Sequence, residues 1–521
     1  MKFLKWKIVL KHVLDNKKLS NMNTDFELIN NIKQCIPAFE NYIANDKIEN
    51  IEYPLDQEVL DIIFNKIISD KNADEFEMFR HIDEIKQLWA KLIKKSIITL
   101  RFYDKREPFI KNHDKYPIAY GIEELESYFK KYVEFESALY GGARYYRDHV
   151  IHVFRVWLLG LRILLKKDNK YLDQILIDEN CQLNGLEKIA VWTLIALTHD
   201  LGYPLEKAQG IINKTKDMMQ SFVANPTISM DLSFSGVQNT MNDFVLRFMS
   251  SKMIPKVMDG NEEYKFVARL QPKYFFKFQK SLERNHHGIL SSLVIYKLLR
   301  YFLESDYSTN EDYYFKEEDV RQFYIRREIL RAISSHTCHD IYHMNYKNFS
   351  FLLILCDDAQ EWGRKYITEL YVNSPLKYTF SGIHFAFNKE NSGDQEKEIA
   401  TISIDESYCN VDKDETIKMI FSRFVDISRS YNEIFRDGQD TGSRNFEFIK
   451  KTIIDNGKND ESVKIHLVLK VSREKTTTLS AKLVAAESDT QDVERFANIL
   501  SELFKKAPGE NNSWSCNLAD F

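Results

Sequence analysis

Histidine and aspartate side chains that could bind a metal ion stand at the ends of five apolar segments in the middle of the chain. They are His152, His199 with Asp200, His287, His336 and Asp357. One histidine in an apolar helix is more often a satisfied core residue than a ligand. Several buried imidazoles and carboxylates need partners at once, however, and a metal ion satisfies them together. Mixed imidazole and carboxylate ligands are typical of Mn, Fe, Co, Ni or Zn, and Mg is also compatible. We therefore expect one or two divalent ions.

The segment Thr198-His199-Asp200-Leu201-Gly202 is the centre of this set. Residues 186–197 are almost entirely apolar and predict a buried helix, and Gly202 with Pro204 predicts its end. A titratable pair at the end of so apolar a helix is costly unless a ligand binds there.

The other candidates follow the same arrangement of a polar residue at the end of an apolar helix. The spacing predicts helices over residues 145–165, 289–303 and 326–335, and an apolar run over residues 349–356. Three ambiguities concern neighbouring residues. His149 lies three residues before His152 on the same helical face and is an alternative ligand or a general acid; His286 stands beside His287, and Asp358 beside Asp357.

The periodicity divides the chain into three regions and predicts a mainly α protein. Residues 1–135 read as a helical accessory region and residues 136–374 hold the metal-ligand candidates. Residues 375–521 read as a small α+β domain with a partly solvated antiparallel sheet. The tail after Pro508 is expected to be loose.

Composition places the protein in the cytoplasm. The six cysteines are scattered and form no CxxC pair, which disfavours a zinc ribbon or a disulfide framework and suits a reducing compartment. No segment has the pattern of a signal peptide or a membrane span. The net charge of −5 is small for 521 residues, so no global field recruits nucleic acid or anionic membrane, although local patches for nucleic acid are compatible with it. The sequence is also compatible with a homo-oligomer.

The order His, His-Asp, two further histidines and Asp resembles the HD-domain superfamily of metal-dependent phosphohydrolases. His152-Val-Phe-Arg-Val resembles the first-histidine helix of the family, and Ala196-Leu-Thr-His-Asp-Leu-Gly202 resembles its namesake motif. Asp357, after Leu352-Leu-Ile-Leu-Cys, resembles the last ligand. The resemblance covers residues 145–364, less than half of the chain. Each of these motifs alone is a weak signal, but their combination in this order is specific to the family.

The resemblance implies a ligand set and a reaction. His152, His199, Asp200 and Asp357 would hold one metal, and His287 and His336 a second, with Asp200 bridging. The reaction would be hydrolysis of a phosphate ester or anhydride in a small phosphorylated substrate, most plausibly a nucleotide or nucleotide second messenger, by metal-activated water, with Asp200 and His149 as catalytic residues. The candidates to neutralise the charge of the phosphate are Arg144, Arg147, Lys207, Lys273, Arg326 and Arg364.

The branch of the superfamily stays unassigned. Tyr203 stands where many relatives, including the diiron oxygenases, have a lysine, and no later histidine follows as in the dNTP triphosphohydrolases. Two alternatives to a phosphohydrolase remain. One is a ligand-sensing or scaffold protein with a non-catalytic site, and the other, disfavoured by Tyr203, is a diiron oxygenase.

Overall fold

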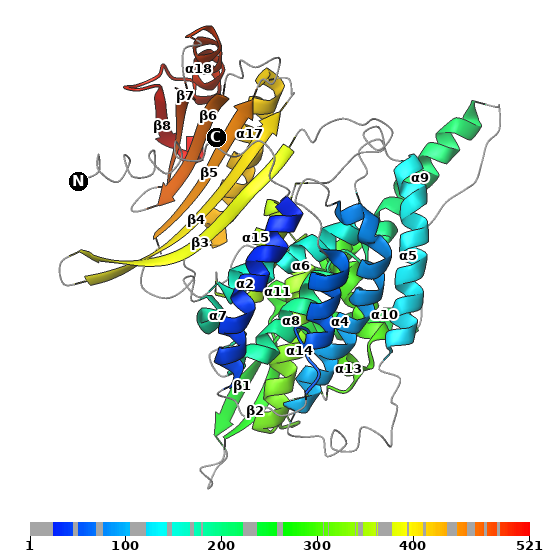
Figure 1. The fold of residues 1–521 in the computed structure, drawn as a ribbon. Helices are drawn as coiled ribbons and strands as arrows, with labels where there is room; N and C mark the ends of the chain where they lie inside the picture. The colour runs from blue at the N-terminus through cyan, green and yellow to red at the C-terminus, as the bar shows by residue number, and fades with distance from the viewer. Residues whose placement is uncertain are drawn as a thin grey trace.

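The computed structural model describes most of the chain between residues 24 and 520 (Figure 1). The described ranges are 24–44, 51–68, 77–104, 121–142, 148–166, 171–178, 181–221, 237–257, 264–305, 307–310, 312–338, 340–341, 347–360, 362, 378–392, 395–409, 413–434, 445–455, 464–473, 477–486 and 490–520. The fold is mainly α with a smaller α+β part, which confirms the predicted fold class.

The described N-terminal part is helical. Its elements are α2 (Thr24–Ala44), α3 (Gln57–Asp61), a π-helix (Ile62–Ile67), a 3-10 turn (Met78–His81), α4 (Ile82–Phe102) and α5 (Ile122–Gly142). They cover one side of the helices that follow (Figure 1). The Trp89 indole on α4 donates a hydrogen bond of 2.9 Å to the backbone carbonyl of Leu197. The Arg155 guanidinium forms a buried ion pair with Asp25 on α2 at 2.6 Å. The N-terminal helices therefore pack directly against the segments that carry the metal-ligand candidates.

The central helices form the main core. They are α6 (Val150–Leu165), α7 (Tyr171–Gln174), α8 (Gly185–Thr198), α9 (Tyr203–Gln220), α10 (Val237–Ser250), α11 (Pro272–Glu283), α12 (His287–Leu298), α13 (Arg300–Leu303), α14 (Glu317–Ser335) and α15 (Phe349–Ala359). Every residue of α8 is buried. Gly160 lets α6 approach α8, because a Cβ there would meet the Trp192 ring at 2.0 Å. The Trp192 indole donates to the Trp157 carbonyl at 3.0 Å, which satisfies a polar group in this apolar contact.

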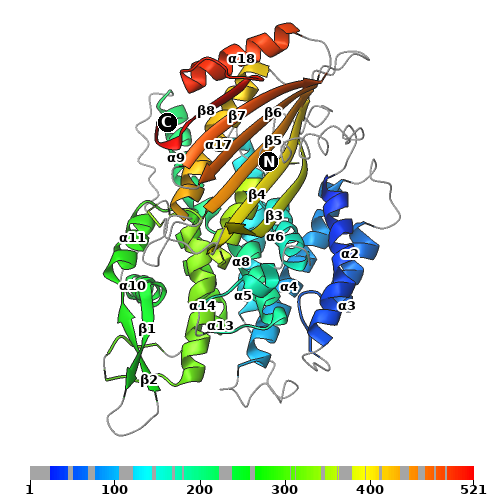
Figure 2. The same cartoon turned by 90° about the vertical axis from the view of Figure 1, so that its left-hand side faces the viewer.

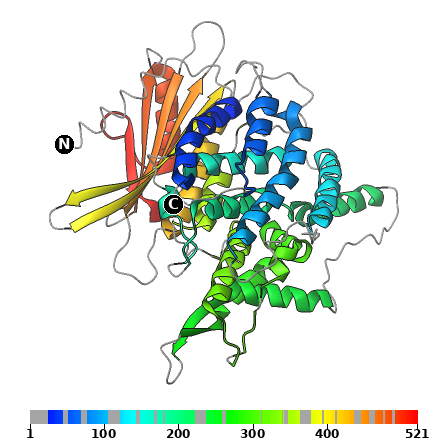
Figure 3. The same ribbon diagram turned by 60° about the horizontal axis from the view of Figure 1, so that its bottom comes forward.

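A two-stranded antiparallel hairpin interrupts the helices, which the periodicity did not predict. Its strands are β1 (Ser251–Val257) and β2 (Tyr264–Leu270). It extends from one end of the helical body (Figures 2 and 3). Met253 and Ala268 are paired across the strands and buried, so that one face of the hairpin packs on the helices.

The C-terminal part is a six-stranded sheet with two helices. The elements in chain order are β3 (Tyr378–Ser392), β4 (Gln395–Cys409), α17 (Lys413–Ile434), β5 (Asn445–Asp455), β6 (Lys464–Arg473), β7 (Thr477–Ala486), α18 (Thr490–Phe504), β8 (Ser513–Asn517) and a 3-10 turn (Leu518–Asp520). Strand order follows chain order, and β4 and β5 pair in parallel while the other neighbours are antiparallel. Phe424 of α17 stacks on Phe448 of β5, with ring centroids 4.8 Å apart.

The described part of the tail, residues 509–520, is ordered, so the expectation of a loose tail was wrong there. Strand β8 pairs with β7, with Trp514 opposite Ala481. The Trp514 ring is buried beside Phe504 of α18. Burial of this large ring and the backbone pairing together hold the segment on the sheet.

The sheet domain touches the helical core through α17 and α15. Arg423 of α17 donates to the backbone carbonyl of Asp358 at 3.0 Å. Tyr431, also on α17, lies edge-on to Phe351 with ring centroids 5.8 Å apart. Among the described helices, none has the length and apolar composition needed to cross a membrane.

Candidate metal centre

His199 and Asp200 lie where helix α8 ends. The helix begins with a capping box in which Asn184 and Glu187 satisfy each other's backbone N–H groups, and His199 is its C-terminal cap residue. Helix α9 begins three residues after Asp200, with Pro204 in its first turn. The two side chains are therefore held between two helices, and both are at least 95% buried.

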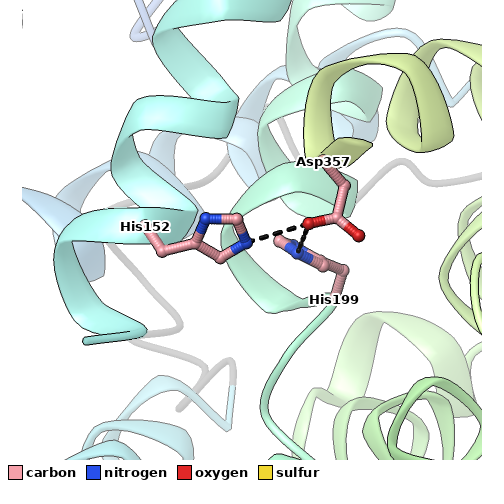
Figure 4. A group of neighbouring side chains, drawn as sticks. All are labelled: His152, His199 and Asp357. Atoms are coloured by element: carbon pink, nitrogen blue, oxygen red, sulfur yellow. Dashed lines mark hydrogen bonds and ion pairs between the residues drawn. The ribbon is translucent and has the colours of Figure 1, made fainter. Parts of the chain in front are cut away.

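Two carboxylates and two imidazoles form the first half of the cluster, and Figure 4 shows three of these four side chains, His152, His199 and Asp357. His152 Nε2 lies 3.0 Å from Asp357 Oδ1 and 3.6 Å from Asp200 Oδ2. His199 Nε2 lies 3.4 Å from Asp200 Oδ2 and 3.9 Å from Asp357 Oδ1. Helices α6, α8 and α15, far apart in the sequence, thus bring these four side chains together.

Asp200 joins this half to a second group. Its other oxygen, Oδ1, lies 3.3 Å from His287 Nε2 and 3.8 Å from His336 Nε2. The two Nε2 atoms are 3.1 Å apart. One carboxylate oxygen of Asp200 therefore faces each pair of imidazoles, as a bridging ligand would.

All four imidazoles present Nε2 to the carboxylates because each Nδ1 is held by an acceptor behind it. The acceptors are the Ala196 carbonyl for His199 at 2.8 Å, the Ile333 carbonyl for His336 at 2.5 Å, Gln360 Oε1 for His152 at 2.5 Å and Glu206 Oε2 for His287 at 2.7 Å. In a neutral imidazole, donation from Nδ1–H leaves the Nε2 lone pair available to an ion, whereas a ring that also donates from Nε2 to a carboxylate carries a second proton that the ion would replace. This is the usual arrangement behind metal-bound histidines.

The candidate ligand atoms lie close enough together to hold a divalent ion. Two ligands each about 2.1 Å from one ion lie about 3.0 Å apart in an octahedral site and about 3.4 Å apart in a tetrahedral one. The potential ligand atoms of His152, His199 and Asp357 all lie within 4.8 Å of one another, and so do those of His199, Asp200 and His336. His199 Nε2 is buried and makes no hydrogen bond. An ion would satisfy it, so the residues fit a metal.

The protonation states of His199 and of the two carboxylates suit a cation. Burial lowers the pKa of His199 to about 4, which keeps the imidazole neutral at pH 7. Burial alone would raise the pKa of Asp200, but His199 and the hydrogen bonds of His287 and His336 hold it well below its usual range. Burial would likewise raise the pKa of Asp357, and the hydrogen bond from His152 more than offsets it. Both carboxylates are ionised, so the cluster offers negative charge. Burial would lower the pKa of His287, but its hydrogen bonds to Asp200 and Glu206 raise it to about 9, so a bound ion would replace a proton on this ring.

The opening of the cluster is on the side of Asp357 and His287. Their side chains are 31% and 18% exposed, whereas those of His152, His199 and His336 are at most 2% exposed. Asp357 and His287 are therefore the histidine and aspartate members of the cluster with the largest exposed fractions.

The geometry distinguishes the two pairs of neighbouring candidates. His287 reaches Asp200, whereas Nδ1 of His286 lies 3.1 Å from Ser281 Oγ on α11. Asp357 contacts His152. Asp358 instead lies near Tyr431 of α17: burial raises the pKa of Tyr431, and the negative charge of Asp358 raises it further. His287 and Asp357 are therefore the members of the cluster.

His149 borders the cluster. Its ring centroid lies 6.1 Å from that of His152 and 4.0 Å from that of Tyr203. Its backbone N–H donates to Glu136 Oε1 at 2.6 Å, and its Nδ1 lies 3.6 Å from the same oxygen. Glu136 therefore fixes both the backbone and the ring of His149 next to the entrance.

The cations proposed from the sequence are scattered. Lys207 is near the cluster, paired with Glu206 at 2.5 Å, with its ammonium 4.9 Å from the centroid of the Tyr203 ring. Arg326 is buried on α14, where it donates to the Tyr301 carbonyl at 2.7 Å and stacks on that ring. Lys273 is exposed on α11. Arg144, Arg147 and Arg364 lie outside the described residues.

Two residues of the site were missed in the sequence, Glu206 and Gln360. Glu206 is in the first turn of α9 and Gln360 caps α15, and each orients a histidine of the cluster. Their only sequence signal is proximity to Asp200 and Asp357. Comparisons with protein-family models, curated proteins and solved structures found no match.

Proposed function

We propose that the protein is a metal-dependent phosphohydrolase of the HD-domain superfamily, acting on a phosphate ester or anhydride of a nucleotide or nucleotide second messenger. The observation that carries the proposal is the convergence of four imidazole Nε2 atoms on Asp200 and Asp357, each imidazole oriented by an acceptor at Nδ1. The order of these residues in the chain is that of the family.

The residues divide between two metal positions that share Asp200. His152, His199, Asp200 and Asp357 would hold one ion, and His287, His336 and the other oxygen of Asp200 a second. Such ions lower the pKa of a water molecule and neutralise phosphate oxygens when bound. The ligand set favours Mn, Fe, Co, Ni or Zn.

The remaining residues near the entrance suit a phosphate substrate. His149 is the candidate acid for the leaving group, because Glu136 fixes it beside Tyr203 at the entrance. Burial would lower the pKa of Lys207, but Glu206 raises it, so Lys207 remains cationic and can attract phosphate. The Tyr203 ring between them could position the substrate.

The first test is a hydrolysis screen of the manganese-loaded protein. The panel holds NTPs, dNTPs, cyclic mono- and dinucleotides and simple phosphodiesters, with Asp200→Ala as the inactive control. We expect turnover of one class by the wild type and by Asp358→Ala, a matched control because Asp358 faces α17. Turnover that persists in Asp200→Ala would contradict the proposal.

Metal content tests the site without assuming a substrate. We expect His199→Ala and Asp200→Ala to lose bound manganese, whereas Asp358→Ala and His286→Ala retain it. Full occupancy in the first two variants would contradict the metal assignment. Loss of metal in those variants combined with no turnover of any substrate would favour the sensing or scaffold alternative.

A further inference from the structure

A pocket lies between α10 and α11, outside the metal cluster. Its volume is about 370 Å³, which is within the usual range for small-molecule sites. Figure 2 shows the two helices side by side above the β1–β2 hairpin. None of the residues that line the pocket is a member of the cluster.

The most buried polar side chain that lines the pocket is Asn242, whose amide nitrogen lacks a partner. Asn242 is 1% exposed, and its Oδ1 accepts a hydrogen bond of 2.8 Å from Gln238 Nε2. Its Nδ2 is buried and has no hydrogen-bond partner. Leaving such a donor unsatisfied costs free energy, which a ligand with a suitably placed acceptor recovers.

The walls around Asn242 suit a flat ring. Phe275, Leu246 and Leu282 supply apolar surface. The guanidinium of Arg247 lies 5.4 Å from the Phe275 ring centroid and pairs with Asp243 at 2.6 Å. Arg247 therefore holds the Phe275 ring in place, and the ring offers a surface on which a heterocycle can stack.

The polar groups of the pocket are amides and carboxylates. Asn239, Gln279 and Asn285 add amides that can both donate and accept, as the edge of a nucleobase requires. Asp243 Oδ2 accepts from Arg247, and Glu283 Oε1 accepts from Gln279 at 3.1 Å. The second oxygen of each carboxylate can accept a hydrogen bond from a ribose hydroxyl or an amino group. None of the described residues lining the pocket is a lysine or arginine, and Arg247 beside it is paired with Asp243, so these residues offer a phosphate group no unpaired cation.

We propose that this pocket binds a nucleobase or nucleoside that carries no phosphate. The buried amide of Asn242 pairs with an acceptor on the base, and the base packs between Phe275 and the two leucines. The carboxylates bind hydroxyl or amino groups and exclude nucleotides. The proposal does not depend on the metal site or on hydrolysis.

The test is calorimetric titration of the full chain in EDTA, so that metal-dependent binding is absent. The probes are adenosine, guanosine, cytidine and uridine, their 5′-monophosphates, and spermidine as a cationic alternative. We expect one equivalent of at least one nucleoside to bind, and its monophosphate to bind more weakly. Asn242→Leu, similar in size, should weaken the nucleoside about tenfold or more.

Two further variants keep the test decisive. Gln279→Trp fills the rim of the pocket and should also abolish binding, whereas Asn65→Leu, an exposed position in the N-terminal helices, should leave it unchanged. No nucleoside binding at millimolar concentration, tighter binding of spermidine, or binding that both pocket variants retain would each overturn the proposal.

Discussion

Glu206 Oε2 accepts two hydrogen bonds from His287, one from the backbone N–H at 2.8 Å and one from Nδ1 at 2.7 Å. The same carboxyl group pairs with Lys207 through its other oxygen. Burial would raise the pKa of Glu206, but the hydrogen bond from His287 lowers it to about 2, so it is ionised. Glu206 thus holds the start of α12 and the ring of His287 against α9, and directs His287 Nε2 toward Asp200.

Removing this carboxylate should weaken metal binding. We expect Glu206→Ala to lower the affinity for manganese about 10- to 100-fold, because second-layer partners of metal-bound histidines have effects of this size. Metal titration of the apo protein measures it, with Glu283→Ala, an exposed carboxylate on α11, as the control. An unchanged affinity in Glu206→Ala would show that His287 is oriented without Glu206 or is not a ligand.

Gln360 plays the corresponding part for His152. Its Oε1 accepts from His152 Nδ1, and its Nε2 donates to the Trp362 carbonyl at 2.7 Å, which fixes the orientation of the amide. Gln360→Met removes both bonds at similar volume. We expect weaker manganese binding and a loss of about 1–3 kcal/mol in the free energy of unfolding, since the buried Nδ1–H of His152 loses its acceptor. The Trp362 carbonyl keeps a second donor, Arg155 Nη1 at 3.2 Å. Gln220→Met, at the exposed end of α9, should change neither quantity.

The N-terminal helix α2 reaches the same network through a buried ion pair. Asp25 accepts from Arg155 Nε at 2.8 Å, from Arg155 Nη2 at 2.6 Å and from the Trp362 indole at 2.8 Å. Asp25→Ala leaves the arginine buried without its carboxylate, which typically costs about 3–5 kcal/mol. Urea unfolding measures the loss, and Asp83→Ala, an exposed carboxylate on α4, should cost far less.

A double variant separates the charge from the packing in this pair. Asp25→Leu with Arg155→Met replaces the ion pair by apolar side chains, and should recover most of the stability lost in Asp25→Ala. If the double variant were as unstable as the single one, the contribution of α2 would come from side-chain packing rather than from the buried charge.

The helices that carry the cluster were predictable because their signal is local. Residues 186–197 and 349–356 are apolar runs that end at His199-Asp200 and Asp357, and the structure has helices at both. The choice of His287 over His286 was not predictable from periodicity, because it depends on the direction of each side chain at the start of α12. Glu206 was missed because its contact with His287 joins residues 81 positions apart.

Contacts distant in sequence also explain the other differences. Strand β8 was taken for a loose tail because its partner β7 lies beyond helix α18, and only the folded chain brings Trp514 to its buried position. Arg326 was grouped with the candidates for phosphate binding because of its charge, yet it is fully buried against Tyr301. Charge alone does not say whether an arginine in an amphipathic helix faces solvent or the core.

Glu328 of α14 makes the stability of the fold depend on pH. The side chain is 4% exposed, and its Oε1 has no hydrogen-bond partner. Burial raises the pKa of Glu328 from about 4.5 to about 7, and nearby Arg331 and Arg327 only partly oppose this. The folded state therefore holds a proton that the unfolded state has released between these two pH values. The resulting stabilisation is complete below pH 4.5 and disappears as the pH rises through 7.

Glu328→Gln should remove this dependence. The amide is neutral at every pH, so the variant should gain stability relative to the wild type as the pH rises from 4.5 to 8, by an amount on the order of 3 kcal/mol. Urea unfolding of both proteins at pH 5.0 and 8.5 measures the difference directly, because the contributions of all other groups cancel. Glu318→Gln, exposed on the same helix, should show little change between the two pH values. If the difference for Glu328→Gln is also the same at both values, the carboxyl group is ionised in the folded protein and is stabilised by Arg327 and Arg331 despite its burial.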